Sequence, residues 1–89
     1  MRDLVMNITA MRRLTATLRD RAVRVNAIAN QFTTRLDTAV TWEGPDASKF
    51  RSEWHGHYRS ELLSLASRLS RSADQLDREI AEQLRARGG

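Results

Sequence analysis

The hexapeptide Thr41-Trp42-Glu43-Gly44-Pro45-Asp46 lies at the middle of this 89-residue sequence and decides its fold. It contains the only proline and the first of four glycines. Gly44 can adopt backbone angles that other residues avoid and can end a preceding helix. Pro45 suits the first position of a following helix, where its missing N–H is not needed, and Asp46 places a negative charge at that helix's positive end. The sequence therefore predicts two helices joined by a turn over residues 41–45.

The stretch before the turn carries two apolar series that each repeat every seven residues. One series is Leu4, Met11, Leu18, Val25, Phe32 and Ala39, and the other is Ile8, Thr15, Ala22, Ala29 and Leu36. Two interleaved heptad series are typical of a long amphipathic helix with a coiled-coil-like seam. We predict a helix over about residues 4–40, which at ~1.5 Å per residue is on the order of 55 Å long. The arginines that avoid both series should face solvent: Arg12, Arg13, Arg19, Arg21, Arg24 and Arg35.

The stretch after the turn carries a second apolar stripe of matching length. Its members step by three or four residues: Ala47, Phe50, Trp54, Tyr58, Leu62, Leu65, Leu69, Ala73, Leu76, Ile80 and Leu84. This spacing predicts a helix over about residues 46–85, followed by a frayed tail over 86–89. The predicted fold is a single all-α domain over residues 1–89, a two-helix antiparallel hairpin.

A lone hairpin buries only one seam, which favours association. Apolar burial contributes roughly 25 cal/mol per Å² and ordering costs about 1.5 kcal/mol per residue, so the balance for one hairpin is near zero. Two hairpins that pack into a four-helix bundle can cover both stripes. We expect the dimer seam to contain Leu4, Ile8, Met11, Leu18, Val25, Phe32, Leu36, Phe50, Trp54, Leu62, Leu65, Leu69 and Leu76.

Composition and charge exclude several classes of protein. The sequence has no cysteine, which excludes disulfides and thiolate metal sites. Its net charge of +4 arises in residues 1–40, which hold seven arginines and three aspartates, while residues 41–89 are balanced. The N-terminal apolar runs stop at three residues, too short for a signal peptide or a membrane span. If the protein is secreted, we expect a Sec-independent route.

The central Trp42-Glu43-Gly44, set between two equal amphipathic helices, resembles the WXG-motif helical hairpins that are substrates of type VII (ESX) secretion, the early secreted antigenic target family. The resemblance implies a small secreted protein, exported as a folded dimer with a related hairpin and recognised through that dimer by the secretion ATPase. It also implies that Trp42 and Gly44 form part of the surface read by the machinery. From the residues alone, Trp42 is a packing residue that fixes the angle between the helices, and Gly44 is a helix stop.

The second helix carries another pattern similar to one seen in this family. It consists of Ala73, Asp77, Ile80 and Leu84, although any amphipathic helix can produce it. Members that carry the export signal usually have Tyr-x-x-x-Asp/Glu after the second helix, whereas the sole tyrosine here, Tyr58, lies early in it with Glu61 three residues later. We therefore expect a partner to contribute the export tail. The positive first helix favours a more acidic hairpin as that partner, with a homodimer of the same family as the alternative.

No constellation in the sequence predicts an enzyme, a cofactor or a metal. No serine has a histidine and an acid at the spacing of a nucleophile elbow, and no glycine-rich phosphate loop is present. Three residues at four-residue spacing could hold a divalent ion, although we interpret them as a solvated charged face: Glu53, His57 and Glu61.

The arginines of the first helix leave a second class of function open, a basic nucleic-acid-binding or architectural helical protein. The aromatic residues lie on the apolar stripes or in the turn instead of alternating with the arginines. We therefore expect neither nucleic acid nor a membrane surface to be the partner. Gly56 lies within the second predicted helix, where it costs on the order of 1 kcal/mol relative to alanine. Its predicted compensation is close approach by a partner helix or by the indole of Trp54 or Trp42.

Overall fold

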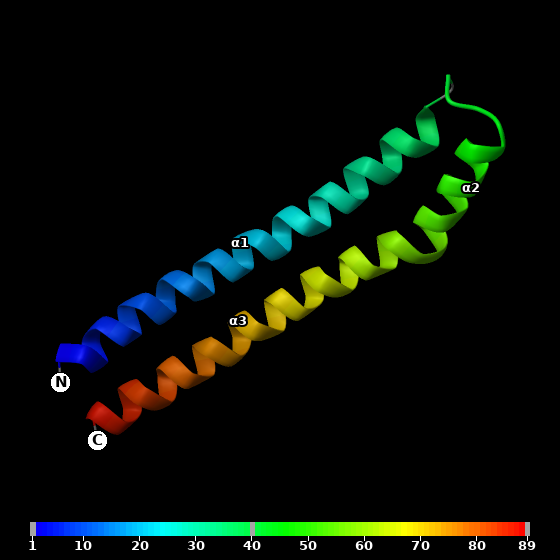
Figure 1. Ribbon diagram of the computed structural model, residues 1–89. Helices are drawn as coiled ribbons and strands as arrows, with labels where there is room; N and C mark the ends of the chain where they lie inside the picture. The colour runs from blue at the N-terminus through cyan, green and yellow to red at the C-terminus, as the bar shows by residue number, and fades with distance from the viewer. Residues whose placement is uncertain (1, 40, 89) are drawn as a thin grey trace.

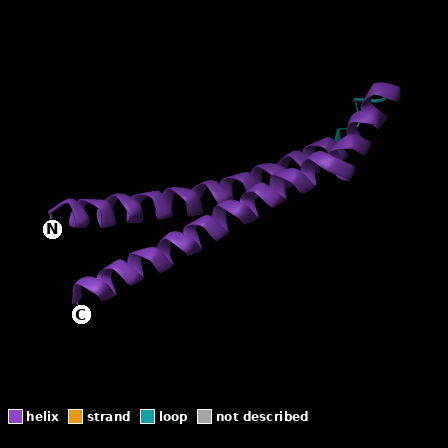
Figure 2. Cartoon of the chain, turned by 60° about the horizontal axis from the view of Figure 1, so that its bottom comes forward, coloured by secondary structure: helices purple, strands orange, loops and turns teal. Residues whose placement is uncertain are grey.

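The chain folds into one extended all-α hairpin in a computed structural model. The structure describes the backbone of residues 2–39 and 41–88 and the side chains of residues 7–39 and 41–88. Helix α1 (Arg2–Thr38) forms the first arm, and α2 (Pro45–Glu53), the π-helical turn η1 (Trp54–Tyr58) and α3 (Arg59–Gly88) form the second arm (Figure 1). Among the described residues, only Ala39 and 41–44 lie outside helices, at one end of the molecule (Figure 2). The predicted antiparallel hairpin is therefore confirmed.

The hairpin is long and thin. It measures 65 × 18 × 15 Å and has a Cα radius of gyration of 19.6 Å. A compact chain of the same length has a radius of gyration of about 12 Å. Because the arms lie side by side, both ends of the described chain lie at the end opposite the turn (Figure 1). A molecule of this shape has little interior, and most of its side chains touch solvent.

Only one of the two predicted heptad series of the first arm is fully buried. Its members are Ile8, Thr15, Ala22, Ala29 and Leu36. The other series lies beside the seam, where Met11, Leu18, Val25 and Ala39 are half-buried and Phe32 is exposed. The side chain of Leu4, which begins that series, lies outside the described residues. In the second arm the buried residues are Ala47, Trp54, Ala66, Ala73 and Ile80.

Small side chains at the seam explain this division. Thr15, Ala22 and Ala29 face the second arm from α1, and Ala66 and Ala73 are buried in α3. Residues without long side chains allow two helices to approach closely, so the middle of the seam holds small groups, and its large buried side chains lie toward the two ends of the arms. The hydroxyl of Thr15 donates a hydrogen bond to the carbonyl of Met11 at 2.9 Å, which satisfies it inside the seam. The larger apolar side chains are consequently left at the surface of the hairpin.

The turn η1 shifts the register of the second arm. Successive buried residues are seven positions apart from Ala47 to Trp54, and again from Ala66 through Ala73 to Ile80. Trp54 and Ala66, in contrast, are twelve positions apart. At ~3.6 residues per turn, eleven residues complete three turns, so twelve require one extra residue. The π-helical turn supplies it, because the N–H of Arg59 bonds to the carbonyl of Trp54, five residues earlier.

This register shift corrects the predicted stripe. Ala66, absent from the predicted stripe, faces the first arm, while Leu65 is 38% exposed. The predicted compensation for Gly56 within the chain is also wrong. A Cβ atom placed on Gly56 would meet no atom within 4 Å, so neither indole approaches it. Gly56 instead lies within η1, where the α-helical hydrogen-bonding pattern is interrupted.

The connection between the arms differs in detail from the prediction. Helix α1 ends at Thr38, six residues before Gly44, so Gly44 does not stop it. Gly44 instead precedes α2, with a φ of 107° that favours glycine, and its carbonyl accepts the first helical bond from Ser48 at 3.0 Å. Pro45 and Asp46 occupy the first turn of α2, as predicted. At the other end, α3 continues to Gly88, so residues 86–88 are helical where a frayed tail was expected.

Candidate functional site

The two sides of the hairpin differ because of helical spacing around the seam. In each arm, the residue three positions after a seam residue lies on one side, and the residue four positions after lies on the other. After Thr15 these are Leu18 and Arg19, and after Ala73 they are Leu76 and Asp77. Because the two arms are antiparallel, the row three positions after the seam residues of one arm lies on the same side of the hairpin as the corresponding row of the other arm. One side of the hairpin is therefore apolar and the other polar.

The polar side carries side-chain bonds between the arms. The Nη2 atom of Arg19 lies 3.0 Å from an oxygen of Asp74 and also bonds to Asp77. The hydrogen bonds that Arg19 donates to Asp77 and then to Asp74 raise the pKa of Arg19 above its usual value. Three further contacts follow along the arms: Arg59 to Asn30 at 3.4 Å, Trp54 to Thr33 at 2.8 Å and His55 to Asp37 at 2.7 Å.

These contacts give a structural explanation for most of the predicted C-terminal pattern. Ala73 and Ile80 are buried in the seam, and Asp77 bonds to Arg19 of the other arm. Leu84 lies four positions after Ile80, on the polar side, and is exposed. The pattern is therefore split between the seam and the polar side, and does not form one continuous surface.

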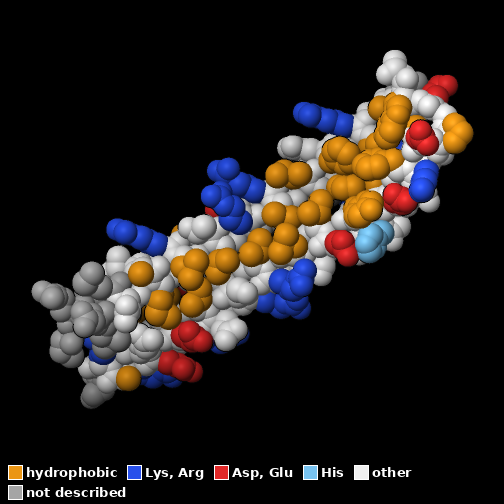
Figure 3. Space-filling model, in the orientation of Figure 1, with side chains coloured by type: hydrophobic (Ala, Val, Ile, Leu, Met, Phe, Trp, Pro, Cys, Tyr) orange, Lys and Arg blue, Asp and Glu red, His pale blue; other side chains and the backbone are white. Residues whose placement is uncertain are grey.

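The apolar side forms a continuous face over both arms. Figure 3 shows hydrophobic side chains running along this side, with charged groups at its borders. We call it the apolar face, and it consists of Met11, Leu18, Val25, Ile28, Phe32, Phe50, Tyr58, Leu62, Leu65, Leu69 and Leu76. Four of these are exposed, among them Phe32 at 39%. No large side chain in the described part of the chain is completely buried, and four of its eight exposed large hydrophobic residues lie on this face.

Residues of the predicted dimer seam are placed at three depths. Ile8, Leu36 and Trp54 are buried between the arms. Phe32 and Leu65 are exposed. The half-buried members are Met11, Leu18, Val25, Phe50, Leu62, Leu69 and Leu76. Leu4 falls outside the described side chains. The predicted set therefore mixes residues of the internal seam with residues of the apolar face. Only the residues of the apolar face are available to a partner.

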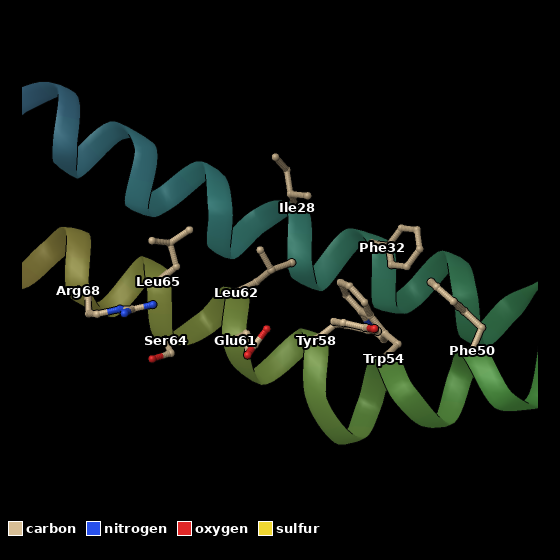
Figure 4. Close-up of a pocket in the computed structure, with 10 residues that line it drawn as sticks. All are labelled: Ile28, Phe32, Phe50, Trp54, Tyr58, Glu61, Leu62, Ser64, Leu65 and Arg68. Atoms are coloured by element: carbon tan, nitrogen blue, oxygen red, sulfur yellow. The ribbon is translucent and has the colours of Figure 1, made fainter.

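The apolar face deepens into an aromatic groove near the turn. The groove has a volume of about 840 Å³, and its lining includes Phe32, Phe50, Trp54, Tyr58 and Leu62 (Figure 4). The ring of Phe32 packs edge-on against Trp54 at 4.5 Å between centroids and against Phe50 at 6.2 Å. These contacts fix the walls of the groove with rings from both arms.

Charges border the groove unequally. On α1, Arg21 and Arg35 each lie seven positions from Ile28, which lines the groove, so they stand on the same helical row. On α3, Glu61 and Arg68 both line the groove. The α1 border is therefore basic, while the α3 border is mixed.

At the turn, Trp42 and Trp54 have opposite environments. Trp54 is 7% exposed, while Trp42 is 41% exposed. Trp42 contacts Phe50 at 5.7 Å between ring centroids, and the guanidinium of Arg51 lies 5.5 Å from its ring. Trp42 therefore packs against Phe50 at the tip of the hairpin, while Trp54 is the tryptophan that fills the space between the arms.

Arg51 is a residue of this region that sequence reasoning missed. Its Nε donates to the carbonyl of Leu36 at 3.2 Å, and its Nη2 donates to the carbonyls of Ala39 and Trp42, both at 2.9 Å. The last carbonyls of a helix have no partner within the helix, so Arg51 satisfies the end of α1 and the connection together. Nothing in the sequence distinguishes Arg51 from the other arginines, because its partners are backbone atoms.

The structure offers no assembled metal site among the described side chains. His57 pairs with Glu61 at 3.3 Å, but in this part of the chain no three His, Cys, Asp or Glu side chains gather closely enough to hold a metal ion. The described helices also include none that is long and apolar enough to cross a membrane.

Comparisons with known proteins give no match to a protein-family model, to a curated protein or to a solved structure.

Proposed function

We propose that this protein is one subunit of a dimeric helical bundle that a type VII secretion system exports in folded form. The observation that carries the proposal is the apolar face, which follows both arms and leaves Ile28, Phe32, Tyr58 and Leu65 exposed in the hairpin. Contiguous exposed apolar patches are typical of protein interfaces. A second hairpin matches its length and shape, because two antiparallel helices laid across two others make a four-helix bundle.

Charge supports a related but more acidic hairpin as the partner. Arg21 and Arg35 stand on the α1 border of the face. Arg21 already bonds to Asp20, so Arg35 is the better placed of the two to meet an acidic side chain of a partner. Each exposed ion pair contributes little, so selectivity depends on several acting together. A second copy of this chain is the alternative partner. It carries an acidic side chain of its own near the face, because Glu79 lies fourteen positions after Leu65 and therefore on the same row of α3. In a second copy this carboxylate is available to the arginines of α1.

The link to secretion rests on the resemblance at the turn. Trp42, Glu43 and Gly44 all lie at one end of the hairpin, and the Trp42 side chain is exposed there. A dimer formed through the apolar face leaves this end accessible to the secretion ATPase. The partner is also expected to supply the Tyr-x-x-x-Asp/Glu tail.

A nucleic-acid-binding role has less support from the charges. Arg19 bonds to two aspartates, and Arg21 and Arg24 both bond to Asp20. These three arginines of α1 are partly neutralised within the chain, which lowers their value as phosphate ligands.

The experiment compares this chain alone with the chain co-expressed with the product of the neighbouring gene. We expect light scattering to give the mass of a 1:1 complex and the thermal midpoint of the complex to exceed that of the chain alone. Export of both proteins from cells that make them, in the absence of a cleaved leader, tests the secretion step. A stable homodimer whose mass and thermal midpoint are unchanged by the neighbour's product would contradict the heterodimer and support the homodimer. A monomer under both conditions would contradict the four-helix bundle.

A further inference from the structure

We infer that Arg51 is a positioning residue that holds the exposed Trp42 side chain in one orientation at the tip of the hairpin. The inference rests on the proposed function, in which Trp42 is read by the export machinery. It concerns a residue outside the Trp-x-Gly motif, on the opposite side of the connection.

The geometry around Trp42 restrains both its backbone and its ring. The Trp42 carbonyl accepts a hydrogen bond from Nη2 of Arg51 at 2.9 Å. The guanidinium carbon lies 5.5 Å from the centroid of the Trp42 ring, within the range of a cation–π contact. Phe50 packs against the same ring at 5.7 Å. The indole is therefore held by two neighbouring residues of α2 although much of its surface is open.

The same guanidinium ties this corner to α1. Its Nε and Nη2 atoms bond to the carbonyls of Leu36 and Ala39, at 3.2 and 2.9 Å. The backbone bonds within the connection are long, at 3.4 Å from Ala39 to Leu36 and 3.5 Å from Trp42 to Ala39. Hydrogen bonds from a charged donor are stronger than neutral ones, so Arg51 provides the firmest contacts of the connection.

The planar fork of arginine is needed for this arrangement. Three carbonyls at different positions are reached by two separate nitrogens. Lysine keeps the positive charge near the negative end of α1, but it has a single nitrogen on a flexible stem. A contribution from charge alone would survive Arg51→Lys, whereas the positioning of Trp42 would not.

The test compares Arg51→Met and Arg51→Lys with Arg59→Met in the full chain in its native assembly. Arg59 is a matched control, because it is also half-buried in the second arm but bonds to Asn30 and not to the connection. Two readouts are measured: the mobility of each indole N–H by nitrogen-15 relaxation, and hydrogen exchange at the amides of Ala39 and Trp42. Trp54 serves as the internal reference, because its indole N–H is bonded to Thr33.

We expect both Arg51 variants to mobilise the Trp42 indole. Exchange at the two amides should speed up by about tenfold or more, because the connection loses its hydrogen bonds from a charged group and opens more readily. The Trp54 indole should be unchanged, and Arg59→Met should leave Trp42 as in the native chain. Arg51→Lys retains the charge, so the proposal can still be tested with this variant if Arg51→Met does not fold. An equally ordered Trp42 and unchanged amide exchange in both Arg51 variants would overturn the inference.

Export separates this inference from the proposed function. If Trp42→Ala and Arg51→Met both lower export while the dimer stays intact, the positioning role is supported. If Trp42→Ala lowers export but Arg51→Met, with a mobile indole, is exported normally, the inference is wrong. If Trp42→Ala itself is exported at the native level, the recognition role in the proposed function fails, and the mobility measurements still decide whether Arg51 positions the ring.

Discussion

The indole Nε1 of Trp54 donates a hydrogen bond to the hydroxyl of Thr33 at 2.8 Å, across the space between the two arms. Thr33 in turn donates to the carbonyl of Ala29 at 2.7 Å, so the contact continues into the backbone of α1. Trp54 also packs against Phe32 and is the first residue of η1, the turn that shifts the register. One side chain therefore connects the seam, the polar side and the aromatic groove.

The two tryptophans should differ strongly in their effect on stability. Trp54→Ala removes a buried indole and should lower the free energy of unfolding by about 3–5 kcal/mol. Trp42→Ala removes a ring that is partly exposed, and the loss should be smaller. Denaturant unfolding of the native assembly, at equal protein concentration, measures both. Equal losses for the two variants would contradict the environments described above.

Deleting Gly56 should preserve the seam. Without this residue, Trp54 and Ala66 would be eleven positions apart, which is about three turns of a regular α-helix. We expect the π-helical turn to become α-helical, with a thermal midpoint equal to or above that of the native chain, since an interior glycine is also removed.

Deletion of Ser72 is the matched control. This exposed serine lies between the seam residues Ala66 and Ala73, where the seven-residue spacing is regular. Its loss should rotate the rest of α3 by about 100° and lower the thermal midpoint clearly. If the Gly56 deletion destabilises as much as the Ser72 deletion, η1 does not act as a one-residue register shift.

Close approach of the arms predicts that the seam tolerates no larger side chain. Ala73 is 0% exposed, and Ala73→Leu should cost about 1–3 kcal/mol of stability through overpacking. Ala81 is exposed on the same helix, and Ala81→Leu should change stability by less than ~0.5 kcal/mol. Thermal unfolding of the two variants provides the comparison, and a neutral Ala73→Leu would mean that the arms are farther apart than described.

The apolar face should be sensitive to charge while the opposite side is not. Leu65→Glu places a carboxylate in the lining of the aromatic groove and should prevent the proposed dimerisation by leaving that charge in an apolar interface. Val23→Glu introduces the same charge at an exposed position that does not line this groove, and the dimer should persist. Sedimentation equilibrium distinguishes the two. Loss of the dimer in both variants, or in neither, would place the interface elsewhere.

The sequence by itself determined the hairpin. Two stripes with helical period and a turn containing Gly44 and Pro45 are local features, and local features fix where helices form and where the chain reverses. They also indicated that one hairpin leaves apolar side chains uncovered. The placement of Pro45 and Asp46 in the first turn of α2 was predictable for the same reason.

The tertiary structure decided which apolar side chains are enclosed. Both heptad series of the first arm have suitable spacing, and only the packing of one arm against the other decides which series is enclosed and which contributes to the apolar face. The extra residue in η1, the burial of Trp54 in place of Trp42, and the bonds from Arg51 to backbone carbonyls all depend on how one arm is aligned with the other. Helical periodicity specifies the direction in which a side chain points along its own helix. It carries no information about the distance, register or backbone atoms of the helix opposite, and these set the arrangement of the tip and of the apolar face.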